Sequence, residues 1–355
     1  MNDDIVFTSL RLRQFRSYED FVVELDPSVN IVVGPNASGK TNLLESILIL
    51  CGNNSYRANY GDLIANGQTW ARIDANLGDS ERVVKIKKNE TIEKTYEIDG
   101  KTKKRLTFND IFPIVLFEPE HMRLITGSPN LRRDFFDSYL SQTDPEFNKL
   151  KSDYTRVLAQ RNKLLKLSKS VIESQIFAWN IRLSELGGNI FQLRINLINK
   201  LNAMLSEVYS QIAMHKTDVQ LNYLTNLQIN NYESSLLSAL ENNIDKDILR
   251  GFTSYGPHRE DIEVKIHNSP AQLVASRGET RTLVLGLKLL EGTLLQESRN
   301  TKPIILLDDV FSELDGLRRT ALTQYLKDYQ TIITTTDADV VAKNFAQKTN
   351  LISLI

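Results

Sequence analysis

The sequence predicts an α/β fold in which a helical segment interrupts a domain of strands and helices. An apolar strand at 29–33 runs into a glycine-rich loop and then into a helix that starts near Asn42. Residues 146–212 follow the helical period of hydrophobic residues, and two further apolar strands come late in the chain, at 304–307 and 331–335. We therefore expect the helical segment to be inserted between two halves of one α/β domain.

Composition places the chain among ordinary globular proteins. Of its 355 residues, 41% are hydrophobic and 25% are charged, and the apolar runs are far shorter than the roughly 20 residues of a membrane span. Asp3 and Asp4 stand where a secretory signal would be basic, and Cys51 is the lone cysteine, so we expect a cytoplasmic protein with no disulfide framework and no membrane partner. The net charge of −1 argues against a uniformly basic surface.

Short strands are expected before the helical segment. Apolar residues and arginines alternate over residues 10–16 in a strand-like register. Further on, β-like runs flank Asp99–Gly100, a dipeptide that favours a tight hairpin turn. We therefore expect an antiparallel sheet over residues 71–106.

The helical segment has hydrophobic residues at intervals of seven. One series is Leu158, Leu165, Ile172, Trp179, Leu186 and Leu193, and its companion is Leu183, Ile190, Leu197 and Met204. A polar break at 168–170 predicts two antiparallel helices. Because so few heptads precede the break, the pattern favours a packed helical subdomain over a long projecting coiled coil.

The strongest local signal is a loop that matches the phosphate-binding P-loop pattern between a strand and a helix. The loop consists of Gly34, Pro35, Asn36, Ala37, Ser38, Gly39, Lys40 and Thr41. Glycines let backbone N–H groups turn toward phosphate oxygens, and the start of the following helix favours their negative charge. We expect Lys40 to hold the β- and γ-phosphates of ATP and Thr41 to place its hydroxyl on Mg²⁺.

A pair of carboxylates follows the strand at 304–307. Ligands bind beside the carboxyl ends of parallel strands, so Asp308 is expected to help hold Mg²⁺ and Asp309 to orient or deprotonate the attacking water. Two adjacent aspartates are often only a solvated turn. Their combination with a P-loop favours the catalytic interpretation.

A Ser-X-Gly segment, Ser276-Arg277-Gly278, opens a later apolar helix. Serine is also a common helix cap, so the segment says little by itself. Its place after the P-loop and before the aspartate pair and residues 312–315 is that of an ABC-type ATPase head. In such heads the signature segment of one protomer completes the ATP site of the other, and on that resemblance Ser276, Arg277 and Gly278 would act in trans.

Segments along nearly the whole chain resemble the RecF family of bacterial recombination and repair proteins. They are 12–18 (Leu-Arg-Gln-Phe-Arg-Ser-Tyr), the P-loop with 42–47, 55–57 (Ser-Tyr-Arg), 117–120 (Phe-Glu-Pro-Glu), 127–129 with Arg132-Arg133, 255–259 (Tyr-Gly-Pro-His-Arg) and 307–315 (Leu-Asp-Asp-Val-Phe-Ser-Glu-Leu-Asp). Each segment is moderately specific, and their common order and spacing set this family apart from others.

The resemblance implies an ABC-type P-loop ATPase head with an inserted helical lid formed by a short antiparallel coiled coil. It also implies slow ATP hydrolysis coupled to dimerisation on gapped or junction DNA, with ATP and Mg²⁺ as cofactors and RecO, RecR and RecA as partners. We expect the halves of the head at 1–125 and 246–355 and the lid at 126–245.

The sequence departs from the family's pattern after the signature serine. Gly278 is followed by Glu279, where the family usually shows Gly-Gln, so an amide donor is missing and the strength of the ATP sandwich is in question. The strand at 331–335 leads into Thr336 and Asp337. The switch histidine of transporter ATPases is therefore absent, as is common in chains that resemble RecF.

Two groups of basic residues are candidates for DNA contact. The hairpin at 82–105 is rich in Lys and Arg. Glutamates are interleaved with these cations, so a solvated sheet face explains the pattern as well as DNA contact does. The stretch 149–169 has seven cations against Asp153 alone. The preferred candidates are therefore Arg161, Lys163 and Lys166, together with Arg132 and Arg133. Contacts of this kind hold a DNA backbone without reading its bases, so binding independent of sequence is expected.

Two other functions share the same motifs. A structural chromosome protein of the SMC type would need a far longer coiled coil than about 65 helical residues provide, at about 1.5 Å per residue. The ATPase subunit of an ABC transporter carries its two nucleotide motifs much closer together than Thr41 and Asp308 lie here. Both remain alternatives to a DNA repair ATPase.

Overall fold

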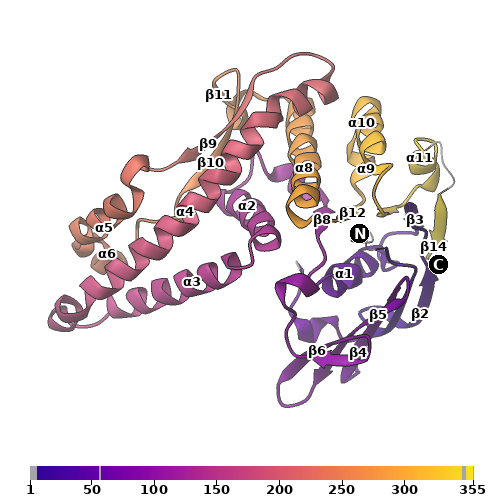
Figure 1. Cartoon of the computed structure of the whole chain (residues 1–355), viewed down its shortest axis with the longest axis horizontal. Coiled ribbons are helices and arrows are strands. Elements are labelled where there is room, and N and C mark those ends of the chain that lie inside the picture. Colours follow the sequence, from indigo (N-terminus) through magenta and orange to yellow (C-terminus); the bar gives the residue numbers. More distant parts are fainter. Residues whose placement is uncertain (1–5, 56, 346–348, 355) are drawn as a thin grey trace. The chain divides into compact units, whose positions relative to one another are not determined.

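The computed structural model describes residues 6–55, 57–345 and 349–354. Asp3, Asp4 and Tyr56, which the sequence analysis used, lie outside the described residues. The chain divides into two units (Figure 1). We call Met1–Met122 with Arg281–Ile355 the head, and Arg123–Thr280 the insert. Among the described residues, no helix is both long and apolar enough to cross a lipid bilayer.

The described part of the head contains an antiparallel and a parallel sheet. The antiparallel sheet has the strand order β2-β1-β4-β5-β6-β7, and the parallel sheet has the order β14-β3-β13-β12-β8. The strands are β1 (Ser9–Phe15), β2 (Tyr18–Glu24), β3 (Val29–Val33), β4 (Trp70–Leu77), β5 (Ser80–Lys88), β6 (Ile92–Ile98), β7 (Lys101–Lys103), β8 (Ile114–Phe117), β12 (Ile304–Asp308), β13 (Thr331–Thr335) and β14 (Asn350–Ser353).

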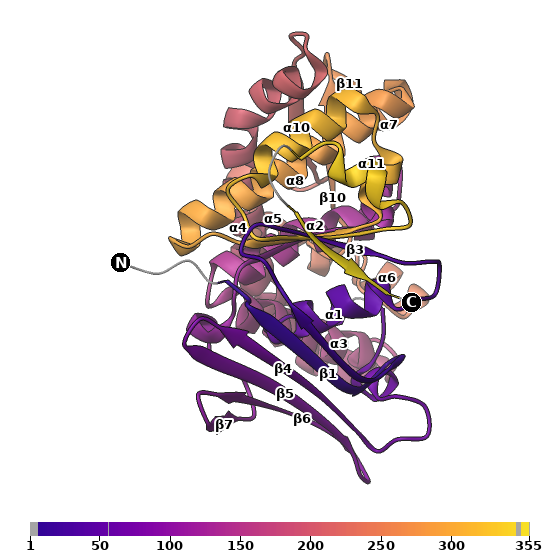
Figure 2. The same ribbon diagram turned by 90° about the vertical axis from the view of Figure 1, so that its right-hand side faces the viewer.

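Helix α1 (Lys40–Leu50) lies between these two sheets (Figure 2). It contacts β12 and β13 of the parallel sheet and β4 and β5 of the antiparallel sheet. Its apolar residues from Leu43 to Leu50 are buried because both sides of the helix face a sheet. This packing holds the start of α1, and the loop before it, in a fixed place at the carboxyl ends of β3 and β12.

Two short helices of the head contact the parallel sheet. α9 (Val310–Glu313) contacts β13, and α11 (Ala338–Ala342) contacts β3. The remaining elements are α8 (Arg277–Arg299), whose first residues belong to the insert, α10 (Gly316–Leu326), and the short 3₁₀ turns η1 (Tyr60–Leu63), η2 (Phe108–Asp110) and η3 (Pro119–Arg123).

The insert is mainly helical and carries a small antiparallel sheet of order β11-β10-β9. The long helix α4 (Lys169–Ala213) packs along α3 (Phe147–Leu164) and α5 (Tyr232–Asn242). The other elements are α2 (Pro129–Thr143), β9 (Val219–Leu224), η4 (Ile229–Asn231), α6 (Ile244–Arg250), β10 (Asp261–Ile266), β11 (Ser269–Pro270) and α7 (Ala271–Val274).

Most of the predicted elements are confirmed. β3, β12 and β13 occupy the three predicted apolar strands, and α3 and α4 are separated at the predicted polar break. In the hairpin between β6 and β7, Asp99 and Gly100 have φ values of 47° and 76°, the left-handed backbone that a two-residue hairpin turn requires.

The end of the insert differs from the expected boundary. The return to the head is expected at residue 246, whereas the chain stays in the insert up to Thr280. The reason is strand pairing, because β10 pairs antiparallel with β9 over the whole register from Asp261↔Leu224 to Ile266↔Val219. Periodicity along the chain did not indicate that these two strands, separated by helices, belong to one sheet.

Candidate functional site

The glycine-rich loop joins β3 directly to α1. Ala37 and Gly39 have φ values of 67° and 100°, and a Cβ at Gly39 would lie 2.8 Å from the Tyr18 hydroxyl and 3.0 Å from the Ser17 hydroxyl. A Cβ at Gly34 would lie 2.5 Å from the Ser38 hydroxyl. Both glycines are therefore required by close approach, and Gly39 also by its backbone conformation.

Lys40 begins α1 and folds back over the loop. Its Nζ donates to the carbonyl oxygens of Gly34 (2.7 Å) and Pro35 (2.8 Å), and the side chain is buried. An ammonium group has three hydrogens, so one remains to donate to an anion above the loop. No side chain caps the N-terminus of α1, so its first N–H groups also face outward toward such an anion.

Thr41 and Asp308 meet although they lie far apart in the sequence. The Thr41 hydroxyl donates to Asp308 Oδ1 over 3.1 Å, and the Thr334 hydroxyl donates to the same oxygen over 2.8 Å. Asp308 is the last residue of β12, and its neighbours in the parallel sheet hold it in place. These oxygens suit Mg²⁺, which takes few protein ligands and completes its coordination with phosphate oxygens and water.

Asp309 follows at the start of α9 with a left-handed backbone, φ 54°. Its N–H donates to the carbonyl and the hydroxyl of Thr334, which fixes the turn. Burial raises the pKa of the Asp309 carboxyl; Lys40 opposes this shift and Asp308 adds to it. A carboxylate with a raised pKa near a phosphate site is suited to accept a proton from water.

Two buried polar atoms of this region lack a hydrogen-bond partner among the described residues: the Ser38 hydroxyl and Asp309 Oδ1. Buried polar atoms without partners are rare in folded proteins and mark places where a ligand or water completes the bonding. Together with the remaining donor of Lys40, these atoms are suited to a phosphorylated ligand and a water molecule.

The segment Arg16-Ser17-Tyr18 anchors this loop, a role that sequence reasoning did not assign to it. The Tyr18 hydroxyl donates to the Gly39 carbonyl over 3.1 Å, and Asn42 Nδ2 donates to the Ser17 hydroxyl over 3.0 Å. Arg16 pairs with the fully buried Glu45 of α1 at 2.8 Å. The segment joins β1 to β2 and so ties the antiparallel sheet to α1.

Glu118, in the segment 117–120, is a second residue whose place the sequence did not reveal. It follows β8, whose Phe117 pairs with Leu307 of β12, so Glu118 comes level with Asp308 across the parallel sheet. Burial, with a contribution from Asp308, raises the pKa of the Glu118 carboxyl. The sequence could nevertheless have indicated Glu118, because it follows an apolar strand just as Asp308 does.

The signature segment lies in the insert as a capping box at the start of α8. The Ser276 hydroxyl accepts from the Glu279 N–H over 3.2 Å, and Glu279 Oε2 accepts from the Ser276 N–H over 2.8 Å. Hydrogen bonds from the Ser276 N–H and from its side chain lower the pKa of the Glu279 carboxyl. Ser276 and Arg277 are exposed. The serine is thus a helix cap, and its hydroxyl also interacts with the Glu279 carboxyl.

Arg132 and Arg161 are not surface residues, so the prediction that they contact DNA is wrong. Arg161 is completely buried and pairs with the equally buried Asp247 at 2.8 Å. Arg132 is 6% exposed and makes a two-pronged ion pair with Asp261. Both guanidinium groups are paired with carboxylates inside the insert.

The remaining candidates differ among themselves. Arg133 is partly buried, donates to the Glu260 carbonyl over 2.5 Å and contacts Asn130, and burial lowers its pKa. Lys163 and Lys166, at the end of α3 and just beyond it, are exposed. They stay available for an electrostatic contact.

The family model and the most similar relatives that follow point to the same protein family. Residues 6–353 match the RecF/RecN/SMC N terminal domain family. The chain is 32% identical over 333 residues to "DNA replication and repair protein RecF" of Clostridium perfringens (strain SM101 / Type A), covering 92% of each chain. It is 34% identical over 352 residues to the protein of the same name from Clostridium botulinum (strain ATCC 19397 / Type A), covering 98% of this chain and 97% of the relative.

Solved structures agree with these relatives. A structure of the recombination mediator protein RecF-ATPrS in the RecFOR pathway superposes with a TM-score of 0.84 and 28% identity, over 96% of this chain and 94% of the other. An Smc head bound to the C-winged helix domain of ScpA superposes with a TM-score of 0.53 and 16% identity, over 96% and 91%. At that identity the second likeness concerns the fold alone, which is an ABC-type ATPase head with a helical insert.

Proposed function

The chain belongs to the RecF family of DNA replication and repair proteins, and from this membership we propose that it is an ATP-dependent DNA-binding protein of repair and recombination. The observation that carries the proposal is the contact between Thr41 and Asp308 at 3.1 Å. It joins the P-loop to the carboxyl end of β12, which is the arrangement that a nucleotide with its metal ion requires.

In this proposal the residues from Gly34 to Thr41 hold the triphosphate of ATP. Lys40 donates its third ammonium hydrogen to the β- and γ-phosphate oxygens. If it gives up its hydrogen bonds to the loop carbonyls, all three hydrogens can donate to phosphate. The Ser38 hydroxyl and the first N–H groups of α1 supply further donors. Bound Mg²⁺ would neutralise phosphate charge, and Thr41 and Asp308 are the residues that would hold it.

Asp309 is proposed to orient the attacking water and to accept its proton. Its raised pKa favours proton acceptance, and its Oδ1 has no other partner among the described residues. Hydrolysis is proposed to be slow, because a single head leaves the far side of the γ-phosphate open to solvent. A second surface is needed to exclude bulk water from this side.

That second surface is proposed to be the signature segment of another copy. Ser276, Arg277 and Gly278 at the exposed start of α8 would face the γ-phosphate in trans, so that ATP joins two copies through two equivalent sites. The Ser276 hydroxyl, which caps the helix by accepting from the Glu279 N–H, is proposed to turn its hydrogen toward a phosphate oxygen. Glu279 replaces an amide with a carboxylate at the same place, which predicts a weaker sandwich.

DNA is the proposed macromolecular partner, bound through its backbone without sequence preference. Lys163 and Lys166 are the exposed cations that remain from the sequence analysis. By analogy with the family, RecO, RecR and RecA are the proposed protein partners, at gapped or junction DNA. A structural chromosome role is disfavoured because α3 has 18 residues, which span only about 27 Å at 1.5 Å per residue.

The test is the mass of the protein in solution with and without ATP and Mg²⁺. Light scattering is expected to show a shift from one copy to two for the wild type, and no shift for Lys40→Ala. A wild-type protein that binds ATP and stays a single copy would remove the dimer from the proposal. A protein that does not bind ATP at all would overturn the proposed function.

A further inference from the structure

A pocket in the insert is lined by cations that play no part in the nucleotide site. It has a volume of about 660 Å³. Lys246 and Arg250 approach it from α6, Arg259 and Tyr255 from the turn before β10, and residues 224–227 close it from the end of β9. Pockets of roughly 300–1,000 Å³ hold ligands of small-molecule size, so this one accommodates about one or two nucleotides.

The three cations are not neutralised. In the part of the chain that the structure describes, none of them has a carboxylate within 4.0 Å. Lys246 donates to the Asn243 side chain over 3.2 Å, and Arg250 donates to the Ser254 hydroxyl over 3.2 Å. Arg259 donates to the Thr253 carbonyl over 3.3 Å. Their partners are neutral oxygens, so the pocket keeps a positive charge.

The acidic residues on the pocket wall do not cancel this charge. Glu260 accepts from the hydroxyls of Tyr223 (2.6 Å), Tyr232 (2.8 Å) and Thr225 (2.6 Å) and is buried. Asp261 makes the two-pronged ion pair with Arg132. Both carboxylates are therefore bonded inward, and the cations are the charges that face a ligand.

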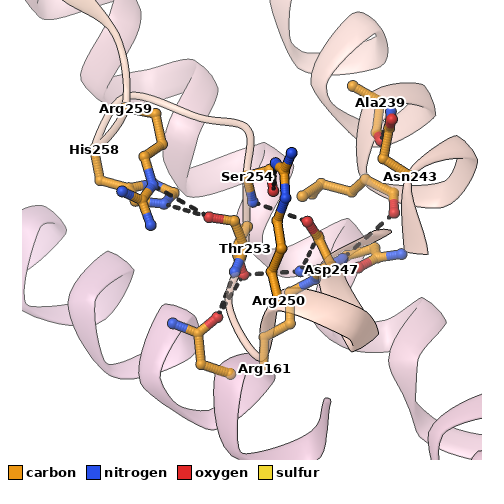
Figure 3. Close-up of polar contacts among 12 residues, drawn as sticks. Arg161, Ala239, Asn243, Asp247, Arg250, Thr253, Ser254, His258 and Arg259 are labelled. Atoms are coloured by element: carbon orange, nitrogen blue, oxygen red, sulfur yellow. Dashed lines mark hydrogen bonds and ion pairs between the residues drawn. The ribbon is translucent and has the colours of Figure 1, made fainter. Parts of the chain in front are cut away.

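A buried network fixes the two segments that carry these cations. Arg161 donates to Asp247 of α6 and to the Thr253 hydroxyl, both over 2.8 Å, and Asp247 accepts from the Ser254 N–H over 3.0 Å. Figure 3 shows Arg250 and Arg259 extending from the segments that this network joins. The side chain expected to touch DNA is instead the support of a basic pocket.

We propose that this pocket binds single-stranded nucleic acid, with backbone phosphates at Lys246, Arg250 and Arg259 and a base against Tyr255. The proposal rests on the proposed function, because it names the strand and the residues of a DNA-binding protein. Basic grooves with interleaved aromatic rings are the usual way that proteins hold a single strand without reading its sequence. The Phe252 ring lies under the Arg259 guanidinium at 4.6 Å and helps to hold this cation in place beside the pocket.

The shape of the site argues for a strand over other phosphate ligands. A duplex presents its backbone on a convex surface and cannot enter a pocket of this volume, whereas a flexible single strand can. The cations come from α6 and from the turn at 254–259, so they are spread over two segments. A flexible single strand can bring successive phosphates to cations on both segments.

The test compares the full-length double variant Lys246→Gln/Arg250→Gln with a matched control, Lys200→Gln/Lys216→Gln. All four side chains are exposed, and the control lysines lie outside the pocket. Anisotropy of a labelled 15-residue oligothymidylate, measured from 50 to 300 mM salt, is expected to show at least a roughly tenfold loss of affinity for the pocket variant. Removing two phosphate contacts also lowers the salt slope by about 1.4. The control is expected to bind like the wild type.

Photocrosslinking gives a second readout. An oligonucleotide that contains 5-bromodeoxyuridine is expected to crosslink to Tyr255, which lines the pocket, in the wild type and to lose this crosslink in the pocket variant. Equal affinity of the pocket variant and wild type, equal loss in the control, or crosslinks only elsewhere would each overturn the proposal. If thymidine monophosphate suppresses the crosslink as well as an unlabelled oligonucleotide does, the pocket binds a free nucleotide. If the pocket variant loses as much affinity for a blunt duplex as for the single strand, the pocket attracts DNA in general. Either result overturns the proposal of a single-strand site. The ATP-dependent mass of the same variants, unchanged in every case, separates these outcomes from failure of the proposed function.

Discussion

The Thr41 hydroxyl donates to Asp308 Oδ1 over 3.1 Å across 267 positions of sequence. Parallel pairing makes this contact possible, because β3 and β12 both flank β13 and end at the same edge of the sheet. The insert lies in sequence between the two residues and leaves the pairing of the strands intact. Separation along the chain therefore does not weaken the site.

Substitution of Lys40 and substitution of Asp309 are expected to impair different steps, ATP binding and ATP hydrolysis. Lys40→Ala removes a charge-assisted contact to phosphate and is expected to weaken ATP binding at least about tenfold, since hydrogen bonds to charged groups contribute roughly 1.5–3 kcal/mol. Asp309→Asn leaves these contacts and is expected to bind ATP normally while hydrolysis slows about 100-fold. Equilibrium titration with a fluorescent ATP analogue and phosphate release separate the two effects. Wild-type hydrolysis in Asp309→Asn would withdraw its catalytic role.

The anchor of the loop gives a conservative test of geometry. Tyr18→Phe removes only the hydroxyl that donates to the Gly39 carbonyl and is expected to weaken ATP binding several-fold, since one hydrogen bond contributes about 1 kcal/mol. Gly39→Ala forces a Cβ against Tyr18 and Ser17 at φ 100° and is expected to abolish binding. Isothermal titration of both variants measures the difference, and normal binding by Gly39→Ala would show that the loop rearranges.

Local patterns were enough to predict the strands, the loop between β3 and α1 and the place of Asp308 at the end of β12, because each depends on neighbours in sequence. The anchor at Tyr18 depends on β1 and β2 meeting α1, which no local pattern contains. Arg161 shows a different limit. Its spacing from the buried Val157 and Leu164 placed it on the inner face of α3, but a cation in a basic stretch was interpreted as surface because its partner, Asp247, lies 86 positions away.

Removal of the buried arginine is expected to destabilise the protein strongly. Arg161→Met leaves Asp247 buried without its partner, and breaking such a pair costs about 3–5 kcal/mol. Lys163 lies on the exposed side of the same helix. The matched control Lys163→Met is therefore expected to change the free energy of unfolding by less than about 0.5 kcal/mol. Urea unfolding followed by circular dichroism compares the two. Similar stabilities would mean that the Arg161–Asp247 pair contributes nothing net.

His258 makes stability depend on pH. Burial, with smaller contributions from Arg259, Arg133 and Arg161, lowers the pKa of His258 from 6.5 to about 4. The unfolded chain then binds a proton that the folded chain does not, so this contribution is complete above pH 6.5 and declines as pH falls toward 4. Between pH 7 and 5 the wild type is expected to lose about 1–2 kcal/mol more than His258→Gln. Parallel pH dependence of the two unfolding free energies would contradict the assignment.

The exposed serine of the signature segment is expected to act on ATP held by another copy. Its hydroxyl caps α8 and is proposed to donate to a phosphate, so substitutions must separate the two roles. Ser276→Asp keeps a good helix cap but adds negative charge where the γ-phosphate would lie, and Ser276→Thr keeps both functions. Light scattering with ATP is expected to show two copies for Ser276→Thr and one for Ser276→Asp, while both still bind ATP.

Mixing two defective proteins tests whether the serine and the P-loop that cooperate belong to different copies. Ser276→Arg blocks the signature segment by size and charge and leaves its own P-loop intact, whereas Lys40→Ala does the reverse. Alone, neither is expected to dimerise with ATP. Mixed, they can form one composite site, because the intact P-loop of one copy faces the intact serine of the other, so a fraction of two-copy species with one bound ATP is expected. A cis arrangement predicts no such rescue, since each copy would then carry one lesion in its own site, and a Ser276→Arg protein that dimerises like the wild type would exclude the trans role altogether.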